Sequence, residues 1–279
     1  MELTADSKAV ASPGRNLSQK ELEECEENQV EASPEEATRY RRLVARANFI
    51  SADRPDISFV VKELCRSMSN PSQQDWRGLK HLARYLVGKP RLVWHFGWQA
   101  ASQTIIVLTD SDWAGCIKTR KSTSGGLMYR GDHMIKHWST TQSTMALSSA
   151  EAELIALVKG GSEGLGLRSL MADLGVQCQI EIGIDAAATI GVVKRQGVGR
   201  VRHLDVRFLW VQEKISSGEF HIRKVLGTEN AADLFTKFLG SDLIHAALVR
   251  MNVWPMEGRA YSAPMIKALC KSHRGTSFH

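Results

Sequence analysis

The stretch Ile105-Ile-Val-Leu-Thr-Asp-Ser-Asp-Trp113 decides the fold of this chain. Its four leading apolar residues are typical of a buried strand, and Asp110 stands where that strand ends. On its C-terminal side, two strand-like segments flank Gly131-Asp132, which is a β-hairpin signal. The sequence therefore predicts a buried strand followed by a hairpin, with an acidic residue at the end of the first strand.

Helices and strands alternate beyond the hairpin. The elements expected between residues 92 and 238 are strands at 92–98, 105–108, 126–130 and 134–138, a helix at 149–174, a strand at 180–184, helices at 186–194 and 204–216, a strand at 219–225 and a helix at 229–238. Three strands followed by alternating helices and strands are typical of a mixed sheet with helices packed on it. We therefore expect an α/β fold, followed by one short helix and a tail over 241–279.

The segment upstream of the sheet has the pattern of helices. Apolar residues recur at helical spacing from Tyr40 to Ile50 and from Ile57 to Met68. Ser72 is a good N-cap for a third helix that ends near Val87. Residues 37–90 carry 11 Lys and Arg against four acids, which indicates either a nucleic-acid contact surface or an ordinary solvated helical face.

The composition excludes several classes of protein. The chain has 279 residues, of which 43% are hydrophobic, so we expect one or two globular domains. No apolar run is long enough for a membrane-spanning helix, and the first 15 residues are too polar for a secretory signal. Five cysteines without a Cys-x-x-Cys pair argue against a disulfide framework or a cysteine zinc site. We therefore expect a reducing intracellular location, in the cytoplasm or the nucleus.

Charge is divided unevenly along the chain. Residues 1–36 carry a net charge of −7, so the remaining 243 residues carry +13. A basic body of this size favours a polyanionic partner, with nucleic acid as the first candidate. The glutamate run and Ser-Pro pairs of the N-terminal segment predict an acidic disordered linker over 1–33.

Four acids stand at the ends of expected elements: Asp110, Glu153, Asp185 and Asp233. Asp110 and Asp185 each follow a strand, so they could share one edge of the sheet. Clustered carboxylates repel one another unless a cation neutralises them, and oxygen ligands suit Mg²⁺ or Mn²⁺. Two such ions can promote phosphodiester hydrolysis. Each acid taken singly also fits a turn former or a helix cap, so both interpretations stay open.

Ordered motifs along the chain point to one family. They are Thr109–Gly115, Arg120–Gly126, Trp138 with Gln142, Ala146–Leu157, Ile184-Asp185, Arg202–Arg207 and Thr228–Lys237. In this order they resemble the ribonuclease H domain of copia-type LTR retrotransposon Pol polyproteins. Further motifs upstream resemble the end of the reverse transcriptase of the same family: Tyr40–Leu43, Arg54–Asp56, Met68–Pro71 and Arg84–Leu86. Together the resemblance covers residues 37–240.

The resemblance implies an α/β fold with a ribonuclease H-like mixed five-stranded sheet and flanking helices. A small helical remnant of the reverse-transcriptase thumb or connection would precede it. The expected division is an acidic disordered linker at 1–33, the helical remnant at 34–98, the ribonuclease H-like domain at 99–240, and a C-terminal helix and tail at 241–279.

The resemblance also implies a catalytic site. Asp110, Glu153, Asp185 and Asp233 would hold two Mg²⁺ ions, or Mn²⁺, and cut the RNA strand of an RNA–DNA hybrid. Glu153 fits the family pattern better than Glu151, which stays the alternative. Asp112 is expected to be structural, and His203 and Asp205 to serve packing and capping. The expected phosphate contacts are the arginines of 39–84 together with Lys194, Arg195, Arg200, Arg202 and Arg207.

Three departures from the family pattern bear on activity. No Tyr-x-Asp-Asp motif occurs, so we expect no polymerase activity from this chain. Alanines follow Asp185 where the family has asparagine. Glycines at 160, 161, 164 and 166 each cost a helix about 1 kcal/mol against alanine, so the helix after Glu153 is expected to be weak unless packing supports it.

The sequence is compatible with three functions. The first is a Mg²⁺-dependent endoribonuclease acting on RNA–DNA hybrids, with other parts of a Pol polyprotein as further partners and no role for a membrane. The runner-up is a catalytically dead retroelement remnant that serves as a nucleic-acid-binding module. The third is a DNA transposase or integrase, which would also use carboxylates to bind metal ions. The motifs that resemble ribonuclease H disfavour it.

Overall fold

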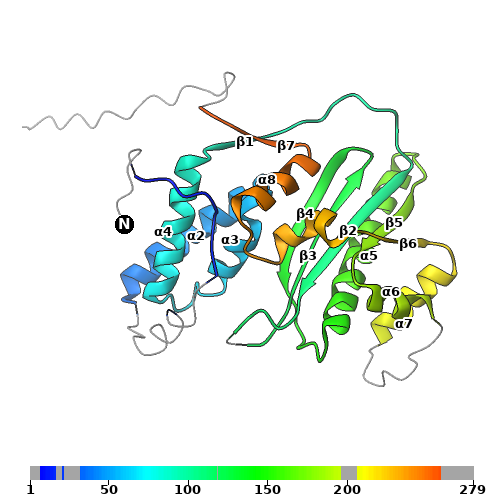
Figure 1. The fold of residues 1–279 in the computed structure, drawn as a ribbon, viewed down its shortest axis with the longest axis horizontal. Coiled ribbons are helices and arrows are strands. Elements are labelled where there is room, and N and C mark those ends of the chain that lie inside the picture. The colour runs from blue at the N-terminus through cyan, green and yellow to red at the C-terminus, as the bar shows by residue number, and fades with distance from the viewer. Residues whose placement is uncertain (1–6, 17–20, 22–31, 118, 196–205, 259–279) are drawn as a thin grey trace, which may run out of the picture.

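The computed structural model describes residues 7–16, 21, 32–117, 119–195 and 206–258. Figure 1 shows a helical unit beside a twisted sheet that carries helices on both faces. The N-terminal elements are α2 (Pro34–Ser51), η1 (Pro55–Ile57), α3 (Ser58–Cys65), α4 (Gln73–Gly88) and β1 (Arg91–Trp94). The sheet region holds β2 (Thr104–Asp112), β3 (Thr123–Arg130), β4 (His133–Thr141), α5 (Ser149–Asp173), β5 (Gln179–Ile184), α6 (Ala187–Lys194), α7 (Val206–Ser216) and β6 (Phe220–Lys224). The last described elements are η2 (Gly227–Glu229), η3 (Ala231–Phe235), α8 (Ser241–Arg250) and β7 (Val253–Met256).

The helical unit forms where its sequence predicts it. Capping boxes start two of its helices: Ser33 caps α2 and Ser72 caps α4. The apolar stripes then meet in a common core, in which Tyr40 is fully buried and donates a hydrogen bond to the Leu64 carbonyl at 3.0 Å. Between α2 and α3, the Arg54 guanidinium binds the buried Asp56 carboxylate through two hydrogen bonds of 2.7 and 2.9 Å.

The main sheet confirms the expected fold class. Its strand order is β4-β3-β2-β5-β6, in which β2, β3 and β4 run antiparallel while β5 and β6 lie parallel to β2. Helices α5, α6 and α7 cover one face, and η3 and α8 cover the other. This is the ribonuclease H-like mixed five-stranded sheet that the resemblance implies. None of the described helices is long and apolar enough to cross a membrane.

The glycines of α5 serve the packing of that helix on the sheet. A Cβ on Gly160 would lie 2.5 Å from Thr109 Cγ2, and one on Gly161 would lie 2.8 Å from the Phe220 ring. Gly164 faces Ile180 and Val107 at 3.2 Å, whereas Gly166 meets nothing. Three of the four glycines therefore let α5 approach the sheet closely. The buried contact offsets their low helix propensity, so α5 runs unbroken over 25 residues.

Three expected elements differ in the structure. The strand expected at 105–108 extends to Asp112 as β2, so Asp110 lies within the strand and pairs with Gly125 instead of following the strand end. The helix expected at 229–238 is replaced by the short 3₁₀ turns η2 and η3, because Asn230 between them adopts an extended backbone. The Asn230 side chain donates to the Thr109 carbonyl at 3.0 Å and accepts from the Ala232 amide at 3.2 Å. The strand expected at 92–98 is shorter, and it pairs with β7 in a separate two-stranded sheet. The C-terminal part of the described chain therefore returns to the start of the sheet region.

The helical unit packs directly on the sheet domain. The rings of Phe59 and Phe238 lie 4.9 Å apart, edge to face. His137 of β4 contacts the Ala52 carbonyl at 3.1 Å. Residues 7–16, within the segment expected to be a linker, lie along α4, where Arg84 Nε donates to the Lys8 carbonyl at 2.6 Å.

Candidate metal centre

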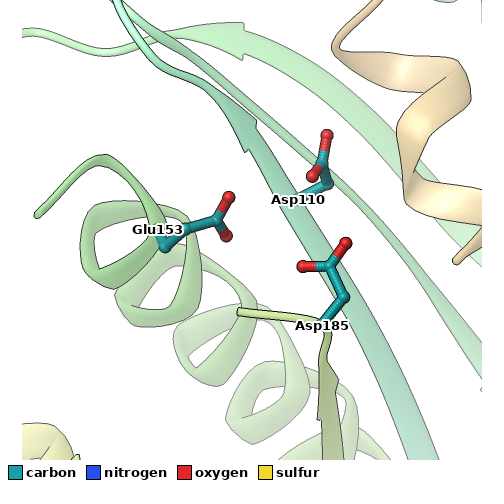
Figure 2. Close-up of side chains that lie close together, drawn as sticks. All are labelled: Asp110, Glu153 and Asp185. Atoms are coloured by element: carbon teal, nitrogen blue, oxygen red, sulfur yellow. The ribbon is translucent and has the colours of Figure 1, made fainter. Parts of the chain in front are cut away.

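Three carboxylates meet at one edge of the sheet. Asp110 lies on β2, Asp185 follows β5 directly, and Glu153 lies near the start of α5. Because β2 and β5 are parallel, their carboxyl ends reach the same edge, where the first turns of α5 also lie. One oxygen from each side chain lies within 4.8 Å of the others. Figure 2 shows the three carboxylates pointing toward one another.

Burial makes two of these three carboxylates costly to ionise. Asp110 and Glu153 are 2% and 8% exposed. Burial, together with the nearby charges of Asp110 and Asp185, raises the pKa of Glu153 to about 8. Burial also raises the pKa of Asp110, with Asp233 and Asp185 adding to the effect and Lys237 and Thr236 opposing it. A cation bound beside Asp110 and Glu153 would favour their ionised forms.

The structure distinguishes the two candidate glutamates. Glu153 Oε1 accepts a hydrogen bond from the Ser111 amide at 3.2 Å, whereas no described residue donates to its buried Oε2. Glu151 is turned to the helix start, where its Oε2 accepts from the Leu147 amide at 2.7 Å. The structure therefore brings Glu153, and not Glu151, to Asp110 and Asp185. An unpartnered buried oxygen within an all-carboxylate group fits a hard cation such as Mg²⁺ or Mn²⁺.

Asp233 lies beside this group and is joined to it through Lys237. The Lys237 ammonium is 2.8 Å from Asp233 Oδ1 and 3.4 Å from Asp110 Oδ2. The Thr236 hydroxyl also donates to Asp110 Oδ2. No role was expected for Thr236 or Lys237, although both lie in the motif Thr228–Lys237. The spacing of Asp233 and Lys237, four residues apart, was the signal that could have suggested their ion pair.

Three further side chains position the site. Asn230 ties the turn before η3 to β2 through the Thr109 carbonyl. Gln142 donates to Ser124 Oγ and to the Ala152 carbonyl at 3.0 and 2.9 Å, which joins the hairpin to α5 just before Glu153. Asp112, expected to be structural, accepts a hydrogen bond from the Thr123 amide across β2 and β3.

The expected basic residues are only partly described. Lys194 is exposed at the end of α6, and Arg195 follows it half-buried. Arg207 lies in the first turn of α7, and its side chain is outside the described part. Arg200, Arg202, His203 and Asp205 also lie outside the described residues. α6, which starts two residues after Asp185, has no side-chain cap, because Ala186 occupies its N-cap position.

Relatives of this chain among known proteins include polyproteins of transposons. No family model matches the chain. Over 186 residues, 66% of this chain, it is 33% identical to the retrovirus-related Pol polyprotein from transposon TNT 1-94 of Nicotiana tabacum. Over 205 residues, 72% of this chain, it is 29% identical to the corresponding polyprotein from transposon RE2 of Arabidopsis thaliana. Each match covers 14% of the relative, so the chain spans about a seventh of the length of these proteins.

Among solved structures, the chain is similar to a ribonuclease H1 isolated from compost by a metagenomic approach. The identity is 17% and the TM-score 0.36, and the match covers 52% of this chain and 99% of the other.

Proposed function

This chain belongs to the copia-type retrovirus-related Pol polyproteins of transposons, and we propose that it is a ribonuclease H that hydrolyses the RNA strand of RNA–DNA hybrids. The observation that carries the proposal is the convergence of Asp110, Glu153 and Asp185 at one edge of a ribonuclease H-like sheet. Three carboxylates from three separate elements meet there, two of them buried. An arrangement of this kind is costly to the fold unless it binds a cation.

The same three residues would hold the divalent cation, Mg²⁺ or Mn²⁺. When bound, such an ion lowers the pKa of a water molecule and offsets charge on a phosphate. The chain's own groups fix the ligands: the Ser111 amide holds Glu153, and the Thr236 hydroxyl holds Asp110. Burial of both carboxylates keeps bulk water from competing for them.

The substrate is proposed from charge and chemistry. The basic body of the chain suits a polyanion, and the exposed Lys194 ends α6, the helix that begins two residues after Asp185. Discrimination for RNA would come from 2′-hydroxyl contacts and the groove shape of the hybrid. Other parts of a Pol polyprotein are the proposed protein partners, in the cytoplasm or the nucleus.

One observation favours a second candidate, a catalytically dead module that binds nucleic acid. The helix that follows Asp185 lacks the cap that a polar residue would provide, because alanine stands at its N-cap position. A less firmly held Asp185 would weaken a metal centre without affecting a basic binding surface.

Hydrolysis of an end-labelled RNA–DNA hybrid in Mg²⁺ tests these alternatives. Asp110→Asn and Asp185→Asn are compared with Asp173→Asn, an exposed acid at the far end of α5. We expect wild type and Asp173→Asn to cleave, and the other two variants to lose cleavage while still binding hybrid. Salt-dependent binding without cleavage by wild type would support the binding module. Cleavage of duplex DNA instead of hybrid would contradict both.

A further inference from the structure

Trp113 is a large apolar side chain that stays exposed next to the acidic site. It follows β2 directly and lies three residues after Asp110. Its indole N–H donates a hydrogen bond to the Ala146 carbonyl at 3.1 Å, and Ala146 lies in the segment that leads into α5. The indole therefore joins the end of β2 to the start of the helix that carries Glu153. In spite of this contact, Trp113 is 54% exposed.

The turn that carries Trp113 is fixed by its neighbours. On one side of Trp113, the Asp112 carboxylate accepts a hydrogen bond from the Thr123 amide. On the other side, the Ala114 amide donates to Ser122 Oγ at 2.9 Å. Ala114 has a left-handed backbone, with φ at 54°, which a residue other than glycine keeps only where its surroundings impose it. The indole is therefore held in place by tertiary contacts, unlike a freely rotating surface side chain.

Two more apolar side chains are exposed beside the Trp113–Ala146 contact. Met145 and Leu147 flank Ala146, and both are more than half exposed. Their segment is also held, because the Leu147 amide donates to Glu151 Oε2 at 2.7 Å. We call Trp113, Met145 and Leu147 the apolar rim. Exposed apolar side chains that the fold holds together typically mark a contact surface.

The place of the apolar rim and the chemistry of a nucleic acid indicate what it contacts. Asp110 and Glu153 lie on the two elements that the Trp113–Ala146 contact joins, so a phosphate held at these acids brings its neighbouring sugars toward the rim. On the outside of a duplex the phosphates are charged and the base edges are polar, whereas the sugar C–H groups that line the minor groove are apolar. Contact between the rim and these sugars would remove apolar surface of both from water.

The shape of the minor groove decides which duplex fits. An A-form-like helix has a wide, shallow minor groove, whereas the minor groove of B-form DNA is about 6 Å wide. A fixed indole with two aliphatic neighbours can lie against the wide groove but cannot enter the narrow one. The rim therefore suits a duplex that contains an RNA strand better than B-form DNA.

We propose that Trp113, with Met145 and Leu147, contacts the sugar edges of the minor groove of an RNA–DNA hybrid beside the phosphate that lies at the acidic site. This role rests on the proposed function, because its ligand is the hybrid proposed there. It adds an apolar, shape-dependent contact to the phosphate contacts expected from basic residues. Trp113 is then a substrate-binding residue that touches a sugar and takes no part in holding a metal ion.

Fluorescence anisotropy of a labelled RNA–DNA hybrid measures this contact without relying on cleavage. All proteins carry Asp185→Asn, which is expected to bind hybrid without cutting it. Trp113→Ala and Trp113→Phe are compared with Trp98→Ala, which removes a fully exposed indole from the segment before β2, the strand whose far end carries Asp110. We expect Trp113→Ala to weaken hybrid binding about tenfold, as is typical when one aromatic contact to a nucleotide is lost. Trp113→Phe keeps a ring and should lose less, and Trp98→Ala should bind like its parent.

Three further measurements separate a substrate contact from a structural role. The salt dependence of hybrid binding should keep its slope in Trp113→Ala, because no charge is removed. The affinity for a B-form DNA duplex should change less than the affinity for hybrid. Binding of Mn²⁺, measured by calorimetry with Asp185 intact, should be the same in wild type and Trp113→Ala.

The other outcomes overturn the proposal in distinguishable ways. Hybrid binding that Trp113→Ala leaves unchanged would overturn the contact alone, and so would equal losses for hybrid and B-form DNA. A lower Mn²⁺ affinity in Trp113→Ala would show that Trp113 supports the acidic site instead of touching the substrate. A parent protein that binds no hybrid would overturn the proposed substrate together with this contact.

Discussion

The Thr236 hydroxyl donates a hydrogen bond to Asp110 Oδ2, across 126 residues of chain. This contact links the turn η3 to the strand β2 at the acidic site. It gives a buried carboxylate one of its few donors, so both the stability of the site and its affinity for a cation depend on it.

The first prediction concerns this hydrogen bond. Thr236→Val keeps the shape of the side chain but removes the donor. We expect the free energy of unfolding at pH 8 to fall by about 1–3 kcal/mol, as is typical when a buried charged acceptor loses its partner. Thr236→Ser, which keeps the hydroxyl, should recover most of the loss. Urea unfolding measures both variants, and a Thr236→Val protein as stable as wild type would contradict the assigned role.

The second prediction concerns pH. The pKa of Glu153 is about 8 in the folded chain, against an ordinary value of 4.5. Between these two values the folded state keeps a proton that the unfolded state releases. The free energy of unfolding of the metal-free chain should therefore fall as the pH rises through this window and level off above it.

Glu153→Gln is the control for this pH dependence. It removes the titrating group, so the melting temperature of the variant should fall less steeply between pH 5 and 8. Added Mg²⁺ should stabilise wild type more at pH 8 than at pH 5, because the ion binds the ionised carboxylates. Equal slopes in wild type and Glu153→Gln would exclude Glu153 as the source.

The third prediction concerns the helix α5. Gly160→Ala places a methyl group against Thr109 and pushes the helix from β2. We expect a loss of about 1–3 kcal/mol of stability, as for other overpacked sites. Gly166→Ala is the matched control: it meets no atom, so it should stabilise the helix by about 0.5–1 kcal/mol. Thermal unfolding of the two variants should therefore shift in opposite directions.

The fourth prediction concerns the start of α6. Ala186 has the extended backbone of an N-cap but no side chain to accept a hydrogen bond. Ala186→Asn should therefore raise stability by about 0.5–2 kcal/mol. Ala188→Asn, in the first turn of the same helix, places the same side chain away from the N-cap position and should not raise stability. A Tm that falls in Ala186→Asn would show that the N-cap position is not limiting.

Much of the fold follows from local patterns. The apolar run before Asp110 and the hairpin signal at Gly131-Asp132 each depend on neighbouring residues, and the structure has a strand and a hairpin at these places. The helix predicted at 229–238 was wrong, because the Asn230 side chain donates a hydrogen bond to the Thr109 carbonyl, which is distant in the sequence. Local propensity carries no information about such a partner.

The sequence by itself determined most of the strands, the long helix α5 and the family, because periodicity and motif spacing are local properties. It also identified Asp110, Glu153 and Asp185 as candidate metal ligands. Only the tertiary structure decided that Glu153 rather than Glu151 faces the site, and that Lys237 lies between Asp110 and Asp233. It also decided that the α5 glycines are contact points. These three features have the same physical cause, because each depends on the close approach of segments that are distant in the sequence. Folding brings these segments together, and the resulting neighbours determine the burial and the charge around each residue.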